Sequence, residues 1–87
     1  MVKGQVVCSL AGRDKGSFLV VVGTKEDYLL VCDGKARPLK RPKLKSKKHL
    51  KITSCIIEQE RITGNKTLRR LLNKTVRGLP KEEKLNV

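Results

Sequence analysis

Apolar residues in the first two thirds of the chain gather in short runs that are separated by polar segments. Residues 4–10, 18–23 and 28–32 are rich in valine, leucine and cysteine, and such runs favour β-strands. Residues 18–23 are apolar at both alternating positions, which is typical of a central strand buried on both faces. The pattern therefore predicts three strands in the N-terminal part of the chain.

The segment after the third run contains a turn signal and a further strand-like run. Asp33-Gly34 favours a tight two-residue turn, so residues 35–39 are the expected returning strand. Pro38 would confine that strand to a sheet edge, because proline has no amide hydrogen to donate. Residues 40–48 are too highly charged for a core element, whereas residues 49–57 again have strand character. The pattern predicts a mainly β fold, a small β-barrel of about five strands.

The spacing of apolar residues changes in the last third of the chain. Four apolar residues recur three or four positions apart, namely Leu68, Leu71, Leu72 and Val76. This spacing predicts one C-terminal amphipathic helix over residues 66–77. Its expected N-terminal cap is Thr63 or Asn65, and Gly78 and Pro80 mark its end.

These elements divide the chain into four parts. We expect a barrel over residues 1–57, a linker over 58–64, the helix within 65–78 and a flexible tail over 79–87. The leucines of the helix would close the open side of the barrel, which leaves its basic face free to touch a partner.

Charge is distributed very unevenly along the chain. It has 21 Lys and Arg against 8 Asp and Glu, so its formal net charge is +13. Residues 1–34 are neutral overall, whereas residues 35–51 hold nine bases and no acid, and residues 61–77 hold six bases and no acid. We call these two segments the first and second basic blocks. The first block indicates a polyanionic partner, since a merely solubilising tail seldom lies between strand-like segments.

Several classes of protein are disfavoured by what the sequence lacks. It has no run of about 18 apolar residues for a membrane-spanning helix, and no apolar signal region, so we expect a cytoplasmic protein. Three well-separated cysteines, Cys8, Cys32 and Cys55, favour small buried side chains over disulfides. A single histidine and no metal-ligand spacing predict no metal, no cofactor and no catalysis.

A charged loop lies between the first two predicted strands. Gly12 and Gly16 flank it, and glycines let the backbone turn tightly while Arg13 and Lys15 remain exposed at the tip. The glycines are only four positions apart and a strand follows, which excludes a nucleotide-binding P-loop. The loop either approaches a phosphate or is a plain solvated turn.

Aromatic residues are scarce, and this favours one mode of nucleic-acid binding. The chain has no Trp, and both Phe18 and Tyr28 lie in apolar runs where we expect them in the core. Proteins that bind unpaired bases usually stack them on exposed aromatic rings. We therefore expect contacts to phosphates and to the shape of a folded RNA. A helix-turn-helix is disfavoured because no helix precedes the predicted one.

The first half of the chain resembles a known family. Residues 4–22, with the loop Gly12-Arg13-Asp14-Lys15-Gly16, resemble the KOW motif, and the basic run with Lys48-His49-Leu50 extends the likeness to residue 53. This order is similar to the KOW ribosomal proteins of the archaeal and eukaryotic large subunit, the fourteen-e type, and to their small stand-alone bacterial relatives. The resemblance implies an SH3-like barrel that binds ribosomal RNA.

The resemblance and the basic blocks together give the expected site. Gly12, Asp14 and Gly16 would shape the loop. The expected RNA contacts are Arg13, Lys15, Arg37, Lys40, Arg41, Lys43, Lys45, Lys47, Lys48 and His49, with Lys66, Arg69 and Arg70 on the helix.

Two functions remain open from the sequence. The first is a non-catalytic RNA-binding protein of the ribosomal type, monomeric when free, with ribosomal RNA and ribosomal proteins as partners and no membrane. The alternative is a KOW module that binds proteins of the transcription or translation machinery.

Overall fold

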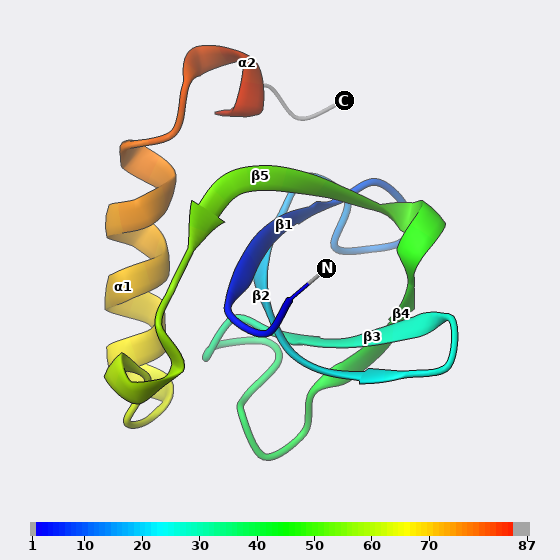
Figure 1. Cartoon of the computed structure of the whole chain (residues 1–87), viewed down its shortest axis with the longest axis horizontal. Coiled ribbons are helices and arrows are strands. Elements are labelled where there is room, and N and C mark those ends of the chain that lie inside the picture. Colours follow the sequence, from blue (N-terminus) through cyan, green and yellow to red (C-terminus); the bar gives the residue numbers. More distant parts are fainter. Residues whose placement is uncertain (1, 85–87) are drawn as a thin grey trace.

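The computed structural model describes residues 2–84, and its elements form one antiparallel sheet flanked by helices (Figure 1). The strands are β1 (Gln5–Ser9), β2 (Phe18–Lys25), β3 (Tyr28–Cys32), β4 (Lys43–Ser46) and β5 (Leu50–Ile56). The helices are α1 (Asn65–Arg77) and the short α2 (Lys81–Lys84), and single 3-10 turns span Lys47–His49 and Gln59–Arg61. The mainly β class, with five strands and one long C-terminal helix, is confirmed.

The sheet curves into a small barrel because its two edge strands follow one another in the chain. The strand order is β4-β3-β2-β1-β5, and the 3-10 turn Lys47–His49 leads directly from β4 into β5 (Figure 1). The interior is one cluster of buried side chains, namely Val7, Leu19, Val21, Leu29, Val31 and Leu50. As expected, β2 is buried on both faces, since Val20 packs on the opposite side from Leu19 and Val21.

Helix α1 covers the outer face of the sheet with its leucine stripe. Leu68 packs with Val20 and Cys32, while Leu71 and Leu72 join a cluster around Val6. The predicted helix is therefore confirmed, and its leucines lie on the outer face of the sheet and do not close an open side of the barrel.

The N-terminal cap prediction for α1 is wrong, whereas the C-terminal one is confirmed. Gly64 occupies the N-cap position without a side-chain hydrogen bond. Asn65 instead accepts a hydrogen bond from the Leu39 amide at 2.7 Å, which ties the helix start to the loop before β4. At the other end, Gly78 caps the helix by donating its amide to the Lys74 and Thr75 carbonyls.

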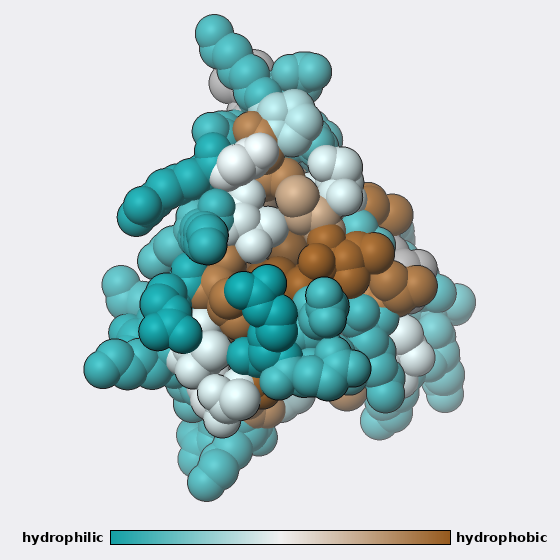
Figure 2. All heavy atoms as spheres, turned by 60° about the vertical axis from the view of Figure 1, so that its left-hand side comes forward, coloured by the Kyte–Doolittle hydropathy of each residue, from teal (hydrophilic) through white to brown (hydrophobic). Residues whose placement is uncertain are grey.

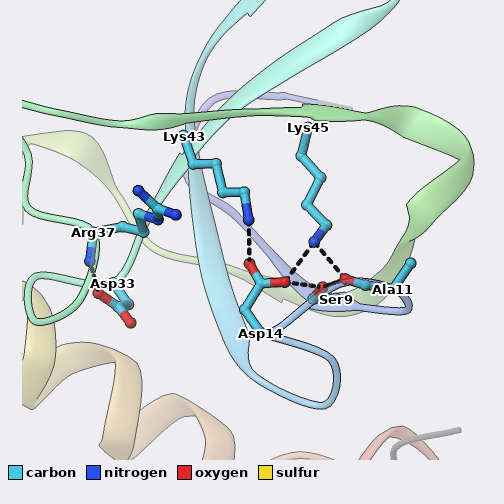
Figure 3. Close-up of polar contacts among 7 residues, drawn as sticks. All are labelled: Ser9, Ala11, Asp14, Asp33, Arg37, Lys43 and Lys45. Atoms are coloured by element: carbon cyan, nitrogen blue, oxygen red, sulfur yellow. Dashed lines mark hydrogen bonds and ion pairs between the residues drawn. The ribbon is translucent and has the colours of Figure 1, made fainter.

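The fourth strand lies later in the chain than predicted. Asp33 Oδ1 accepts hydrogen bonds from the Lys35 amide at 2.8 Å and from the Arg37 amide at 2.9 Å, the second of which is drawn in Figure 3. The Arg37 carbonyl in turn accepts hydrogen bonds from the amides of Asp33 and Gly34. These bonds make a closed turn, so residues 35–39 form no strand. The chain pairs with β3 only at β4, within the segment that we expected to be too charged for a core element.

The end of the described chain is helical over α2, which lies within the segment 79–87 predicted as a flexible tail. Helix α2 lies beside β5, where the Glu83 carboxylate accepts hydrogen bonds from the Ser54 amide and from Ser54 Oγ. The rest of the predicted tail, residues 85–87, lies outside the described residues.

The cysteines behave as small apolar side chains. Cys8 and Cys32 are buried and Cys55 is half-buried, and none of these three cysteines is in a disulfide. Burial, with the nearby Asp33 charge, raises the pKa of Cys32 to about 11, so this thiol stays protonated near neutral pH. Among the described helices, none has the length and apolar character needed to cross a membrane.

Candidate nucleic-acid interface

The loop between β1 and β2 turns twice within a few residues. Gly12 and Gly16 have φ angles of 85° and 89°, a left-handed conformation that glycine adopts without strain. The Lys15 amide donates to the Gly12 carbonyl and the Ser17 amide to the Asp14 carbonyl. This backbone leaves the side chains of Arg13 and Lys15 exposed at the tip.

Asp14 turns the other way, toward the barrel, where β4 supplies its partners (Figure 3). Its Oδ1 accepts hydrogen bonds from Lys45 Nζ at 2.5 Å and from Ser9 Oγ at 2.8 Å. Lys45 Nζ also donates to the Ala11 carbonyl at 2.7 Å, so one ammonium group binds the loop at two points, Ala11 and Asp14. Lys43 Nζ lies 3.6 Å from Asp14 Oδ2 and adds a second positive charge.

This cluster keeps the Asp14 carboxylate ionised. Burial alone would raise its pKa, but the hydrogen bonds from Lys45 and Ser9 and the charges of Lys45 and Lys43 outweigh that effect and lower it. The Lys45 side chain is only 6% exposed, so the pair is largely shielded from solvent. A buried ammonium is tolerated here because a carboxylate and a carbonyl neutralise and solvate it.

The Lys45 side chain therefore does not point outward, as its position in the first basic block suggested. We had grouped it with the RNA contacts, yet its ammonium faces inward and is already bonded to the loop. Lys43 is intermediate, with 29% of its side chain exposed. The remaining predicted contacts are all exposed, namely Arg13, Lys15, Arg37, Lys40, Arg41, Lys47, Lys48, His49, Lys66, Arg69 and Arg70.

Three surface hollows join basic residues from distant parts of the chain. The first lies between the loop and α1 and is lined by Ser17, Asp33, Lys35, Arg69 and Arg77 among others. The second shares Ser17 and Asp33 with the first and adds Arg13, Arg37 and Lys43. The third shares Lys43 with the second and adds Tyr28, Lys48 and His49.

Because neighbouring hollows share lining residues, they adjoin one another, and we call the three hollows together the basic furrow. It joins the loop, the first basic block and α1 of the second block. Six of the predicted contacts are exposed but line none of these three hollows, namely Lys15, Lys40, Arg41, Lys47, Lys66 and Arg70.

Sequence reasoning missed three residues that line the furrow. Lys35 and Arg77 belong to the basic blocks, but only the docking of α1 beside the loop brings them to the same hollow. Tyr28 was expected in the core, and it is 44% exposed. Phe18, the other aromatic residue, is partly buried against the cluster around α1.

Residues 2–84 contain no group of three or more His, Cys, Asp or Glu side chains placed to hold a metal ion. Asp33 and Asp14 lie along the furrow among bases, where they orient backbone and lysine groups.

Neither a comparison with protein-family models nor one with curated protein sequences gives a match. The geometry of the furrow and the chemistry of its residues therefore carry the functional argument.

Proposed function

We propose that this chain is a non-catalytic RNA-binding protein whose basic furrow holds the phosphate backbone of a structured RNA, with ribosomal RNA as the first candidate. The observation that carries the proposal is the furrow itself, which gathers bases from three separate segments of the chain. The resemblance of the loop and the first basic block to KOW proteins favours RNA among polyanions.

The charge of the furrow suits a polyphosphate better than a small acid. Its exposed bases include Arg13, Arg37, Lys48, Arg69 and Arg77, which are spread along connected hollows instead of meeting at one point. Arginine and lysine contacts to phosphates position a protein on RNA and release bound counterions. Binding through the furrow should therefore weaken steeply as the salt concentration rises.

Substitution within the furrow tests the proposal. The triple variant Arg13→Ala, Arg37→Ala and Lys48→Ala should bind a structured ribosomal RNA fragment far more weakly than the unchanged chain. Each lost phosphate contact should lower the slope of log affinity against log salt by about 0.7 to 0.9. Fluorescence anisotropy with labelled RNA at several salt concentrations between about 50 and 200 mM measures both quantities.

A matched control separates the furrow from net charge. Lys3, Lys81 and Lys84 are exposed and line none of the three hollows, and changing them to Ala removes the same charge. This control should keep most of the affinity and nearly the full salt slope. Equal losses in both triple variants, or RNA binding that ignores salt, would refute the furrow as the interface.

A second function has one observation in its favour. A hollow lies between α1 and β5, lined by the apolar side chains of Cys55, Ile56 and Leu71 and by Arg61 and Lys74, and Ile56 is 57% exposed. Figure 2 shows apolar atoms gathered in one area beside α1, with hydrophilic side chains around them. Such an area suits a protein partner. If the chain bound no structured RNA at low salt, this hollow would become the leading candidate.

A further inference from the structure

Tyr28 places an aromatic ring on the surface of the barrel, where it adds little to the packing of the core. It opens β3 directly after the turn at Glu26 and Asp27. Its cross-strand partner is Ser46, while the next pair, Leu29 and Lys45, faces the barrel interior. Because side chains alternate along a strand, Tyr28 points outward. The ring is 44% exposed and contributes to none of the three buried clusters that hold the barrel and α1 together.

A second exposed apolar side chain lies next to it. Leu44 pairs with Leu30, so it is the diagonal neighbour of Tyr28 on the same outward face, and it is 43% exposed. Diagonal neighbours on a sheet lie within reach of an aromatic side chain. Tyr28 and Leu44 therefore form a small apolar surface on the edge strand of the barrel.

This apolar surface lies at the end of the basic furrow. The third hollow has a volume of about 730 Å³, within the range of sites that hold small ligands. Tyr28 and Leu44 line it together with Lys43, Lys48 and His49. Asp27 is the carboxylate of the same hollow, on the Tyr28 side, and it disfavours a phosphate directly at the ring.

The combination of a ring, an aliphatic neighbour and flanking cations matches one nucleotide. A nucleobase is flat and uncharged, so it can stack on Tyr28, and its phosphates can reach the lysines across the hollow. A base within a duplex is already stacked on its neighbours and cannot reach a side chain on the protein surface. The occupant must therefore be an unpaired nucleotide in a loop, a bulge or an end.

We propose that this hollow binds an unpaired nucleotide of RNA, with its base stacked on Tyr28 and its phosphates beside Lys43 and Lys48. The proposal rests on the proposed function, because the furrow delivers the RNA backbone to this end of the barrel. It adds to phosphate binding a preference for RNA that has an unpaired base.

The chain contains its own reporter for this contact. Tyr28 is the only tyrosine and the chain has no tryptophan, so intrinsic fluorescence comes from this one ring. A base stacked on the ring should quench this emission. We expect quenching with an RNA hairpin that has an unpaired loop, and none with a blunt RNA duplex that has the same number of phosphates.

Affinity measurements on variants complete the test with the same two RNAs. Tyr28→Ala should weaken binding of the hairpin about five- to hundredfold, as loss of one stacked base predicts, and should change duplex binding less than about twofold. Tyr28→Phe keeps the ring and should bind both RNAs like the unchanged chain. Tyr28→Leu keeps an apolar side chain without a ring, so a loss with Leu but not with Phe identifies stacking and not folding.

Failure of this inference is distinct from failure of the proposed function. If the unchanged chain binds both RNAs and Tyr28→Ala leaves hairpin binding intact, the unpaired-nucleotide site is refuted and phosphate binding stands. Equal losses for hairpin and duplex, or an emission that neither RNA quenches, also refute it. If the unchanged chain binds neither RNA, both proposals fail.

Discussion

The two basic blocks of this chain are both rich in lysine and arginine, but they differ in how many of these side chains are exposed. The second block, residues 61–77, contains α1, whose leucines are buried while its lysines and arginines are all exposed. The first block, residues 35–51, contains β4, where Lys45 is buried and Lys43 is half-buried against Asp14. A run of positive charge in a sequence is therefore not equivalent to a positively charged surface.

The difference follows from the geometry of the two elements. A helix separates its faces every three to four residues, so an amphipathic sequence can expose every charge. A strand sends alternate side chains to opposite faces, and Lys45 must therefore face the same side as Leu29. The long aliphatic stem of a lysine tolerates this position provided that its ammonium finds partners. Asp14 and Ala11 supply them from the loop.

The largest expected effect on stability concerns α1 in the second basic block. Leu68→Ala should lower the free energy of unfolding by about 3–5 kcal/mol, because it opens a cavity beneath α1 at a fully buried position. The control Arg70→Ala, on the exposed face of the same helix, should change it by less than about 0.5 kcal/mol. Urea unfolding measures both. A loss below about 1 kcal/mol for Leu68→Ala would mean that α1 does not dock on the sheet.

The next effect concerns the buried charge of the first block. Asp14→Ala leaves the Lys45 ammonium without its carboxylate, which should cost about 3 kcal/mol of stability. Asp33→Ala is the matched control, because it removes an aspartate whose hydrogen bonds go to exposed amides, and it should cost only about 1 kcal/mol. Thermal and urea unfolding of the two variants give the comparison. Equal losses of stability in the two variants would show that the ion pair between Lys45 and Asp14 has no special role in stability.

The smallest effect is a dependence of stability on pH that arises in only one block. The pKa of Asp14 is lower in the folded chain than in the unfolded one, so its contribution is complete above the ordinary value near 4 and disappears as the pH falls through the folded-state pKa. Asp14→Asn should be less stable than the unchanged chain at neutral pH, and the gap should narrow in acid. The second block contains no carboxylate and adds nothing to this slope. Unfolding midpoints of both chains at a series of pH values measure this difference. A difference in stability that stayed constant with pH would contradict the role of the Asp14 carboxylate.

The parts of the fold that depend on local pattern were predictable from the sequence. The helix follows from the spacing of Leu68, Leu71 and Leu72, and the first three strands follow from valine-rich runs. The fourth strand was misplaced because Asp33-Gly34 was interpreted as a hairpin turn. The Asp33 carboxylate instead binds the amides of Lys35 and Arg37, which closes the turn before any strand can begin.

The parts of the site that depend on long-range contacts were not predictable. Lys45 is indistinguishable from its neighbours in the sequence, and its partner Asp14 lies 31 positions away. Tyr28 stands in an apolar run, and only its register with Ser46 shows that it faces outward. The sequence assigns residues of the loop and of the first block to the same expected interface, yet strand alternation decides which side chains of β4 remain exposed.

The contact between α2 and β5 has a consequence for how copies of this chain behave when crowded together. Strand β5 ends the sheet order, so its outer amides could recruit a strand from another molecule. The Glu83 carboxylate accepts a hydrogen bond from the Ser54 amide, so this amide is not available to pair with a strand of another molecule. The net charge of +13 keeps free copies apart, but a polyanion that neutralises it removes this repulsion. When a polyanion neutralises the positive charge, the blocked edge of β5 still hinders strand pairing between copies of the chain.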